Sequence, residues 1–128
     1  MPAFVDASIL VAIVLGEPGA PSLRRLVARQ DSLFASELLA AEFLAAAKRE
    51  GIQAEEAGAV LAPLRWVFPA RSLRREVERV LAAGYLRGAD VWHLACACYL
   101  APDPSELAFL TRDKAQRRVA AELGFPTP

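Results

Sequence analysis

Short apolar runs alternate with longer stretches of helical periodicity along this chain. The short runs, bounded by Gly, Pro, Asp and Ser, predict strands over residues 3–5, 32–35, 67–69 and 107–111. The longer stretches carry apolar residues at three- and four-residue spacing and predict helices over residues 7–15, 21–29, 37–50, 54–66, 73–83, 90–100 and 114–123. Ser36 and Ser72 are expected to cap two of these helices, and Pro63 to bend or end the fourth.

The order of these elements predicts the fold class. Strands alternate with helices and no β-hairpin signal occurs, which favours an α/β/α sandwich with a short, mostly parallel central sheet. The 128 residues contain no repeat, low-complexity tract or linker, so residues 1–128 are expected to form one domain. A hydrophobic share of 55% is enough to build a sizeable core.

The overall charge identifies no partner. Lys+Arg and Asp+Glu both number 15, and the formal net charge is zero. No global field therefore attracts nucleic acid, membrane or acidic ligands, and any such partner must be held by a local patch.

Cysteine usage and hydropathy bear on the compartment. Cys96 and Cys98 stand two apart in a helical run and face different ways, so we expect buried, reduced thiols of a cytoplasmic protein. The apolar residues 9–15 follow no Lys or Arg and precede no small-residue cleavage site, which argues against a signal peptide. No apolar run approaches the roughly 18 residues of a spanning helix, and we expect no membrane contact.

Two aspartates follow predicted strands directly. Asp6 ends the strand at residues 3–5, in FVDASIL, and Asp113 follows the last strand, in FLTRDK. Because ligands of open parallel sheets bind beyond the carboxyl ends of the strands, the two carboxylates are expected at one edge of the sheet. The alternative for each is that it only caps the next helix.

Two further carboxylates stand in apolar surroundings. Glu42 is the only polar residue between Leu38 and Ala47, and Asp90 opens the helical run VWHLACACYL. A solvated helix face for Glu42 and an N-cap role for Asp90 are the structural alternatives. If the fold gathers all four acids, their mutual repulsion calls for a cation, and oxygen ligands suit Mg²⁺ or Mn²⁺. Such a site typically hydrolyses phosphodiesters.

The segments FVDASIL, GADVWHLACA and FLTRDKAQRRVAAELGF, together with the lone Glu42, resemble the PIN domain, and more narrowly VapC-type toxin ribonucleases of toxin–antitoxin pairs. The resemblance implies a PIN-like α/β/α fold and a metal-dependent endoribonuclease. It implies that Asp6, Glu42, Asp90 and Asp113 are catalytic and hold one or two Mg²⁺ or Mn²⁺ ions, and that the hydroxyls of Ser8 and Thr111 steady these acids. The partners it implies are an RNA substrate and a small antitoxin, and we expect a homodimer.

Other polar residues are interpreted more plainly. His93, the only histidine, is expected to be packed in an apolar helix rather than catalytic. Arg112 and Lys114 flank Asp113 and are weak candidates for substrate phosphate contacts. Four further arginines could bind RNA phosphates, but we expect most of them on a solvated helix face: Arg71, Arg74, Arg75 and Arg79. Three aromatic residues could stack bases, but we expect them in core or interface packing: Trp66, Trp92 and Tyr99.

Two other functions stay open at this point. One is a catalytically inactive PIN-like module that binds RNA or protein. The other is a receiver-type phosphoacceptor domain, which needs an acidic pair beside the first strand, whereas Ala7 follows Asp6 here.

Overall fold

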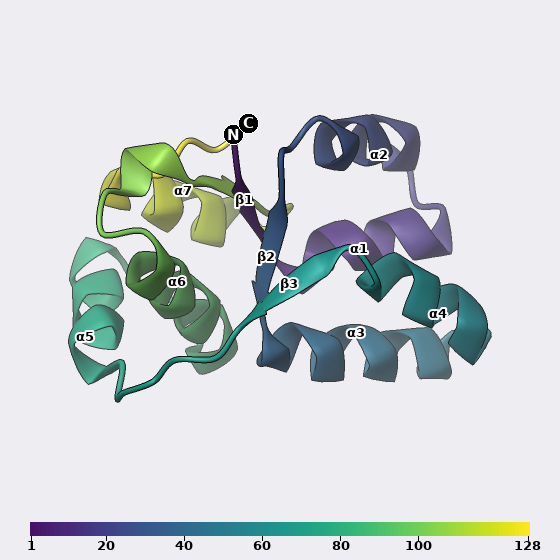
Figure 1. Ribbon diagram of the computed structural model, residues 1–128, viewed down its shortest axis with the longest axis horizontal. Helices are drawn as coiled ribbons and strands as arrows, with labels where there is room; N and C mark the ends of the chain where they lie inside the picture. Colours follow the sequence, from purple (N-terminus) through teal and green to yellow (C-terminus); the bar gives the residue numbers. More distant parts are fainter.

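The computed structural model describes residues 1–128 as a parallel four-stranded sheet covered by seven α-helices (Figure 1). The strands are β1 (Ala3–Val5), β2 (Leu33–Ser36), β3 (Leu64–Val67) and β4 (Ala108–Leu110). The helices are α1 (Ala7–Leu15), α2 (Ala20–Ala28), α3 (Glu37–Arg49), α4 (Ala54–Leu61), α5 (Arg74–Ala83), α6 (Gly88–Leu100) and α7 (Lys114–Leu123). A short 3₁₀ helix, η1 (Pro104–Glu106), lies in the loop before β4.

The sheet has the strand order β3-β2-β1-β4, and every pairing is parallel. Strand β1 is therefore an inner strand, with Phe4 opposite Phe34 on one side and opposite Phe109 on the other. Every crossover between parallel strands needs a connecting segment, and the helices supply it. The predicted α/β class with a short parallel sheet is confirmed.

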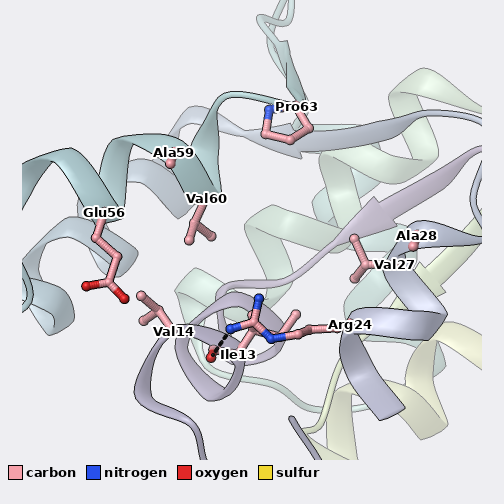
Figure 2. A pocket seen from close by; sticks show the side chains of 9 residues that line it. All are labelled: Ile13, Val14, Arg24, Val27, Ala28, Glu56, Ala59, Val60 and Pro63. Atoms are coloured by element: carbon pink, nitrogen blue, oxygen red, sulfur yellow. Dashed lines mark hydrogen bonds between the residues drawn. The ribbon is translucent and has the colours of Figure 1, made fainter. Parts of the chain in front are cut away.

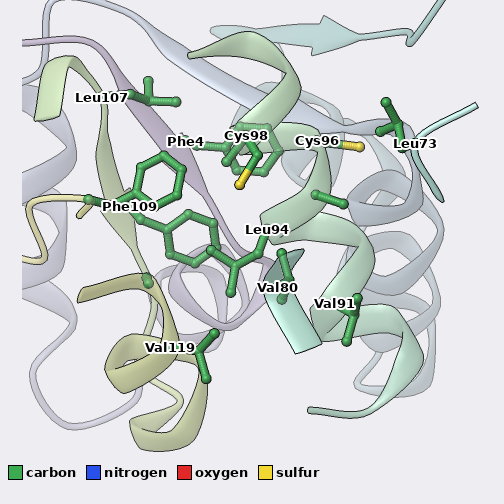
Figure 3. Close-up of a cluster of buried hydrophobic side chains, with 14 of the residues drawn as sticks. Phe4, Leu73, Val80, Val91, Leu94, Cys96, Cys98, Leu107, Phe109 and Val119 are labelled. Carbon is green, nitrogen blue, oxygen red and sulfur yellow. The ribbon is translucent and has the colours of Figure 1, made fainter. Parts of the chain in front are cut away.

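Helices cover both faces of the sheet (Figure 1). Side chains of a strand alternate between faces, so Phe4 belongs to the core under α5, α6 and α7, while its neighbours Ala3 and Val5 belong to the core under α1, α3 and α4. In the first core the rings of Phe4 and Phe109 stack with centroids 5.8 Å apart (Figure 3). This alternation is what makes three-residue strands sufficient to hold two layers together.

The helix predicted over residues 54–66 is wrong in its second half. Helix α4 ends at Leu61, and residues 64–67 form β3, which pairs with β2 from Leu33↔Leu64 to Ser36↔Val67. The strand predicted over residues 67–69 therefore lies mostly outside the sheet. Helical spacing of apolar residues continues through Trp66, but pairing with the otherwise open edge of β2 decides the local conformation.

Cys96 and Cys98 are buried free thiols within the core that α6 forms with the sheet, as expected (Figure 3). Burial raises the pKa of the Cys96 thiol to about 12. Both residues are therefore packing elements at neutral pH rather than nucleophiles. No helix is both long enough and apolar enough to cross a bilayer.

Candidate functional site

Asp6 and Asp113 both follow strands at the carboxyl edge of the sheet, and both cap the next helix. Oδ2 of Asp6 accepts a hydrogen bond from the Ser8 amide at 3.2 Å, and Oδ1 of Asp113 accepts one from the Gln116 amide at 2.8 Å. Both residues thus cap helices, but capping uses only one oxygen of each carboxylate. No hydrogen bond reaches Oδ1 of Asp6 or Oδ2 of Asp113, so each carboxylate keeps an oxygen for another ligand.

Glu42 is half-buried on α3 and is held by a histidine from α6. Its Oε1 lies 2.5 Å from Nε2 of His93, and Oδ1 of Asp6 lies 3.7 Å from the same nitrogen. The solvated-face alternative for Glu42 is therefore wrong. His93 therefore lies between two predicted acids that come from different parts of the chain.

The other ring nitrogen of His93 fixes the tautomer. Nδ1 lies 2.9 Å from Oγ of Ser36, the last residue of β2. Because Nε2 faces two carboxylates, which accept hydrogen bonds only, we assign its proton to Nε2 from the hydrogen-bond network. In the neutral ring Nδ1 then accepts from the Ser36 hydroxyl. Ser36 stands at the N-cap position of α3 as predicted, but its hydroxyl serves His93 and makes no capping bond.

Asp90 lies in the first turn of α6, which begins two residues earlier than predicted, at Gly88. It is therefore not the N-cap, and that alternative is wrong. No side chain or backbone group donates a hydrogen bond to its carboxylate. Burial raises the pKa of Asp90, and the negative charges of Asp6 and Asp113 raise it further, while Arg87 and His93 oppose the rise. Asp90 is therefore near enough to Asp6 and Asp113 for their charges to act on it, whereas the group whose ligand atoms lie within 4.8 Å of one another contains only Asp6, Glu42 and His93.

Of the two predicted supporting hydroxyls, that of Thr111 lies beside Asp6, whereas that of Ser8 contacts Thr111 and the amide of Arg112. Oγ1 of Thr111 is 3.4 Å from Oδ2 of Asp6, 3.4 Å from Oγ of Ser8 and 2.7 Å from Oε1 of Gln116. A hydroxyl has one proton, and the short contact shows that Thr111 donates it to Gln116. Asp6 therefore gains little hydrogen bonding from Thr111.

Gln116 links the hydroxyl to a third acid. This residue of α7 has no exposed surface, and its Nε2 donates to the backbone oxygen of Asp90 at 3.3 Å. Gln116 thereby connects the start of α6 to the loop after β4. Thr111 in turn accepts from the Asp113 amide at 3.1 Å, so the two hold the positions of Asp90 and Asp113.

Arg112 and Lys114, the two weak candidates for phosphate contacts, differ in whether their positive charge is already paired. Arg112 is held in an ion pair with Glu17 at 2.5 Å, and its amide donates to Oγ of Ser8. Lys114, the first residue of α7, is exposed and forms no ion pair. Of the pair, only Lys114 therefore has a free cationic head beside the acids.

A divalent cation fits this set of donors. Asp6, Glu42 and His93 each offer a ligand atom, and these atoms lie within 4.8 Å of one another. The proton on Nε2 makes His93 a hydrogen-bond donor to the acids, so carboxylate oxygens are the available ligands, and such hard donors suit Mg²⁺ or Mn²⁺. The free oxygen of buried Asp6 and the unpaired carboxylate of Asp90 are groups that a cation would satisfy.

Sequence reasoning placed His93 correctly in the interior but missed its contacts. It also missed Ser36 as a partner and Gln116 as a link. One signal for His93 was available, since it stands three residues after Asp90 and so lies on the same face of α6. Nothing in the local sequence signals Gln116.

Comparison with known proteins bears on this geometry. No individually curated protein matches the chain significantly. The sequence model of the PIN domain matches residues 3–122, which include all four predicted acids, the strands that position them and His93. A parallel α/β/α fold with acids at the carboxyl edge of its sheet is consistent with that match. The chain belongs to the PIN domain family.

Proposed function

We propose that this protein is a metal-dependent endoribonuclease whose catalytic residues are Asp6, Glu42, Asp90 and Asp113. PIN domains are generally nucleases, which supports hydrolysis of a phosphodiester. The observation that carries the proposal is the grouping of acids at one edge of the sheet. Oxygens of Glu42 and Asp6 both lie near Nε2 of His93. The negative charges of Asp6 and Asp113 raise the pKa of Asp90.

The four carboxylates would hold Mg²⁺ or Mn²⁺. When bound, such an ion stabilises negative charge on the phosphodiester and makes water more acidic at neutral pH. The chain's own residues position this chemistry. Asp6 and Asp113 are fixed by the helices that they cap, and Lys114, which is exposed at the start of α7 and follows Asp113 in the chain, would contact a substrate phosphate.

His93 is a positioning residue in this proposal. It has no exposed surface and both of its ring nitrogens are engaged, so it does not reach a substrate. Its Nε2 proton holds the Glu42 carboxylate toward Asp6. The hydrogen bonds from Ser36 through His93 to Glu42 would thus align the acid of α3 with Asp6, which follows β1.

A cleavage assay with purified protein tests the proposal. We expect the protein to cut RNA when Mn²⁺ or Mg²⁺ is added and to stop when EDTA is added. Asp6→Asn should keep the helix cap, since Asn caps as well as Asp, and should lose cleavage. Glu106→Gln, on the distant turn η1, is the control and should cut like the wild type. If Asp6→Asn cuts as fast as wild type, the assignment is wrong.

The resemblance to VapC-type toxins extends the proposal to regulation. A cytoplasmic ribonuclease of this kind would be restrained by a small antitoxin, and a guanidinium from that antitoxin would form bidentate pairs with the acids. We place the antitoxin's apolar segment in the hollow of about 450 Å³ between α1, α2 and α4. Figure 2 shows Ile13, Val14, Val27 and Val60 lining it, beside Arg24 and Glu56.

A homodimer is the oligomeric state that we propose. Leu81 and Tyr85 are exposed apolar side chains that line one hollow beside α5, and they support an interface with a second copy. Light scattering of the protein alone, and again with the product of the adjacent gene, tests both partners. A monomer that does not bind that product would contradict the toxin interpretation and leave the nuclease proposal in place.

The main alternative is a PIN-like module that binds RNA or protein without cutting it. It predicts binding without metal-dependent cleavage, so the same assay separates it from the nuclease. The receiver-type phosphoacceptor alternative is weakened by family membership and by the position of Glu42 on a helix rather than beside Asp6 in the chain.

A further inference from the structure

A second polar site lies at the far end of α6 from the acids. Arg71, Arg75 and Arg79 line a hollow of about 440 Å³ that is closed on its other side by Cys98 and Tyr99. Asp90 is in the first turn of α6 and Tyr99 near its last residue, which corresponds to about 13 Å along the helix axis. The hollow is therefore separate from the four acids but lies along the same helix.

One of the three arginines, Arg71, already forms an ion pair within the chain. Arg71 forms a two-contact ion pair with the buried Glu76, with both N–O distances at 2.9 Å, and its guanidinium lies 5.2 Å from the centre of the Tyr99 ring. It also donates to the backbone oxygen of Ser72. These contacts neutralise Arg71 and fix it as a wall of the hollow.

The other two arginines have no partner within the chain. Arg75 and Arg79 stand four residues apart on α5, so they lie on one helix face, and neither forms an ion pair or a hydrogen bond. Like charges at this spacing destabilise a helix slightly. Arg75 also lies in the first turn of α5, where the helix dipole disfavours a cation. Both costs would be relieved by an anion between the two guanidinium groups.

Arg75 and Arg79 both line the hollow, and their charges act on two other residues that line it. The hydrogen bond from Arg71 lowers the pKa of Glu76, and the charge of Arg75 lowers it further. Burial raises the pKa of the Cys98 thiol, and the charge of Arg79 opposes that rise. With one glutamate against three arginines, the lining carries a surplus of positive charge.

We infer that Arg75 and Arg79 form a phosphate-binding subsite that holds the backbone of RNA a few nucleotides from the cleavage position. The inference rests on the proposed function for its choice of RNA. Two guanidinium groups match a phosphodiester oxygen pair. The acids and this subsite would contact one strand that follows α6.

Binding of a labelled single-stranded RNA, measured by fluorescence anisotropy in EDTA, tests the inference without cleavage. Arg75→Gln and Arg79→Gln should each weaken binding roughly 3- to 10-fold at moderate salt and lower the slope of log K against log salt by about 0.7. Arg74→Gln is the matched control. It removes the same charge from the same helical turn, but Arg74 is paired with Glu78 and does not line the hollow. It should leave affinity and slope near those of the wild type.

Equal affinity in all three variants and the wild type would overturn the inference, and cleavage in Mn²⁺ by the same proteins would show that the nuclease proposal survives. Inorganic phosphate at matched ionic strength distinguishes the source of the anion. If phosphate binds through Arg75 and Arg79 while RNA affinity is unchanged in the variants, the hollow takes a free phosphate and the assignment to RNA is wrong.

Discussion

Nε2 of His93 lies 2.5 Å from Oε1 of Glu42, although 51 residues separate the two in the chain. The contact joins α6 to α3 across the carboxyl edge of the sheet, and Ser36 at the end of β2 holds the other side of the ring. Three elements therefore meet at one imidazole. The alignment of Glu42 depends on this meeting, because no other residue donates a hydrogen bond to its carboxylate.

Replacing the imidazole of His93 should weaken metal binding, and this loss should exceed what the lower free energy of unfolding alone would cause. Outer partners of metal ligands typically contribute 10–100-fold in affinity, so we expect His93→Ala to lose about that much for Mn²⁺, measured by calorimetric titration. The cavity and the lost hydrogen bonds should also cost about 2–4 kcal/mol of unfolding free energy.

Leu94→Ala is the matched control for that variant. Leu94 is the next residue of α6, is fully buried and packs in the core under α5 and α7. It should be destabilised by a similar amount, about 2–5 kcal/mol, with Mn²⁺ affinity unchanged. Equal loss of affinity in both variants would mean that His93 acts only through folding.

Removing the charge of Asp90 should stabilise the metal-free protein. A carboxyl whose pKa is raised in the fold is most favourable when protonated, so its contribution falls as pH rises from the ordinary pKa through the raised one. At pH 7 we expect Asp90→Asn to melt roughly 1–3 °C higher than wild type in EDTA. The gain should vanish below the ordinary pKa of the carboxyl.

Added metal should reverse the order of the two melting temperatures. Added Mn²⁺ stabilises whichever protein binds it, so it should raise the Tm of wild type and have little effect on Asp90→Asn. A variant that melts lower than wild type in EDTA at pH 7 would contradict the mutual repulsion of these acids.

Two substitutions of Asp113 separate its capping role from its proposed metal role. Asn caps a helix about as well as Asp, whereas Ala loses about 1 kcal/mol at such a position. Asp113→Asn should therefore unfold near the wild-type midpoint in urea, and Asp113→Ala earlier. Both should lose the Tm increase with Mn²⁺. If Asp113→Asn keeps the full increase, Asp113 is a cap and not a ligand.

Gly84 is required by close packing rather than by its backbone angles. A Cβ at this position would lie 2.8 Å from Cγ2 of Val119, where α7 packs against the end of α5. Gly84→Ala should cost about 1–3 kcal/mol in urea unfolding. Gly58→Ala, inside α4 and facing open space, is the control and should gain about 0.5–1 kcal/mol.

The sequence could single out the four acids as candidates because strand ends and apolar surroundings are local features. Asp6 and Asp113 follow short apolar runs directly, and Glu42 interrupts an Ala- and Leu-rich helix. The parallel sheet followed from the alternation of elements. These predictions did not depend on how the helices pack against one another.

Contacts made across elements were not predictable in the same way. The burial of His93 follows from its apolar neighbours, but its partners depend on how α6 crosses α3. Likewise, the periodicity of residues 64–66 is compatible with helix, and only the edge of β2 selects a strand. The hollow beside Tyr99 arises because the start of α5 lies against the end of α6. The arginines that were predicted on a solvated helix face therefore line one common hollow.

The pairing of β1 with β4 has a consequence for synthesis on the ribosome. Phe4 is paired with Phe109, and the amide of Asp6 donates to the backbone oxygen of Leu110. Strand β1 therefore cannot complete its pairing until β4 has been synthesised, and contacts of such long sequence separation form slowly. Asp113 follows β4, so the four acids come together only after that strand has emerged. Under the proposed function, a nascent chain that lacks β4 would not cut the RNA around it.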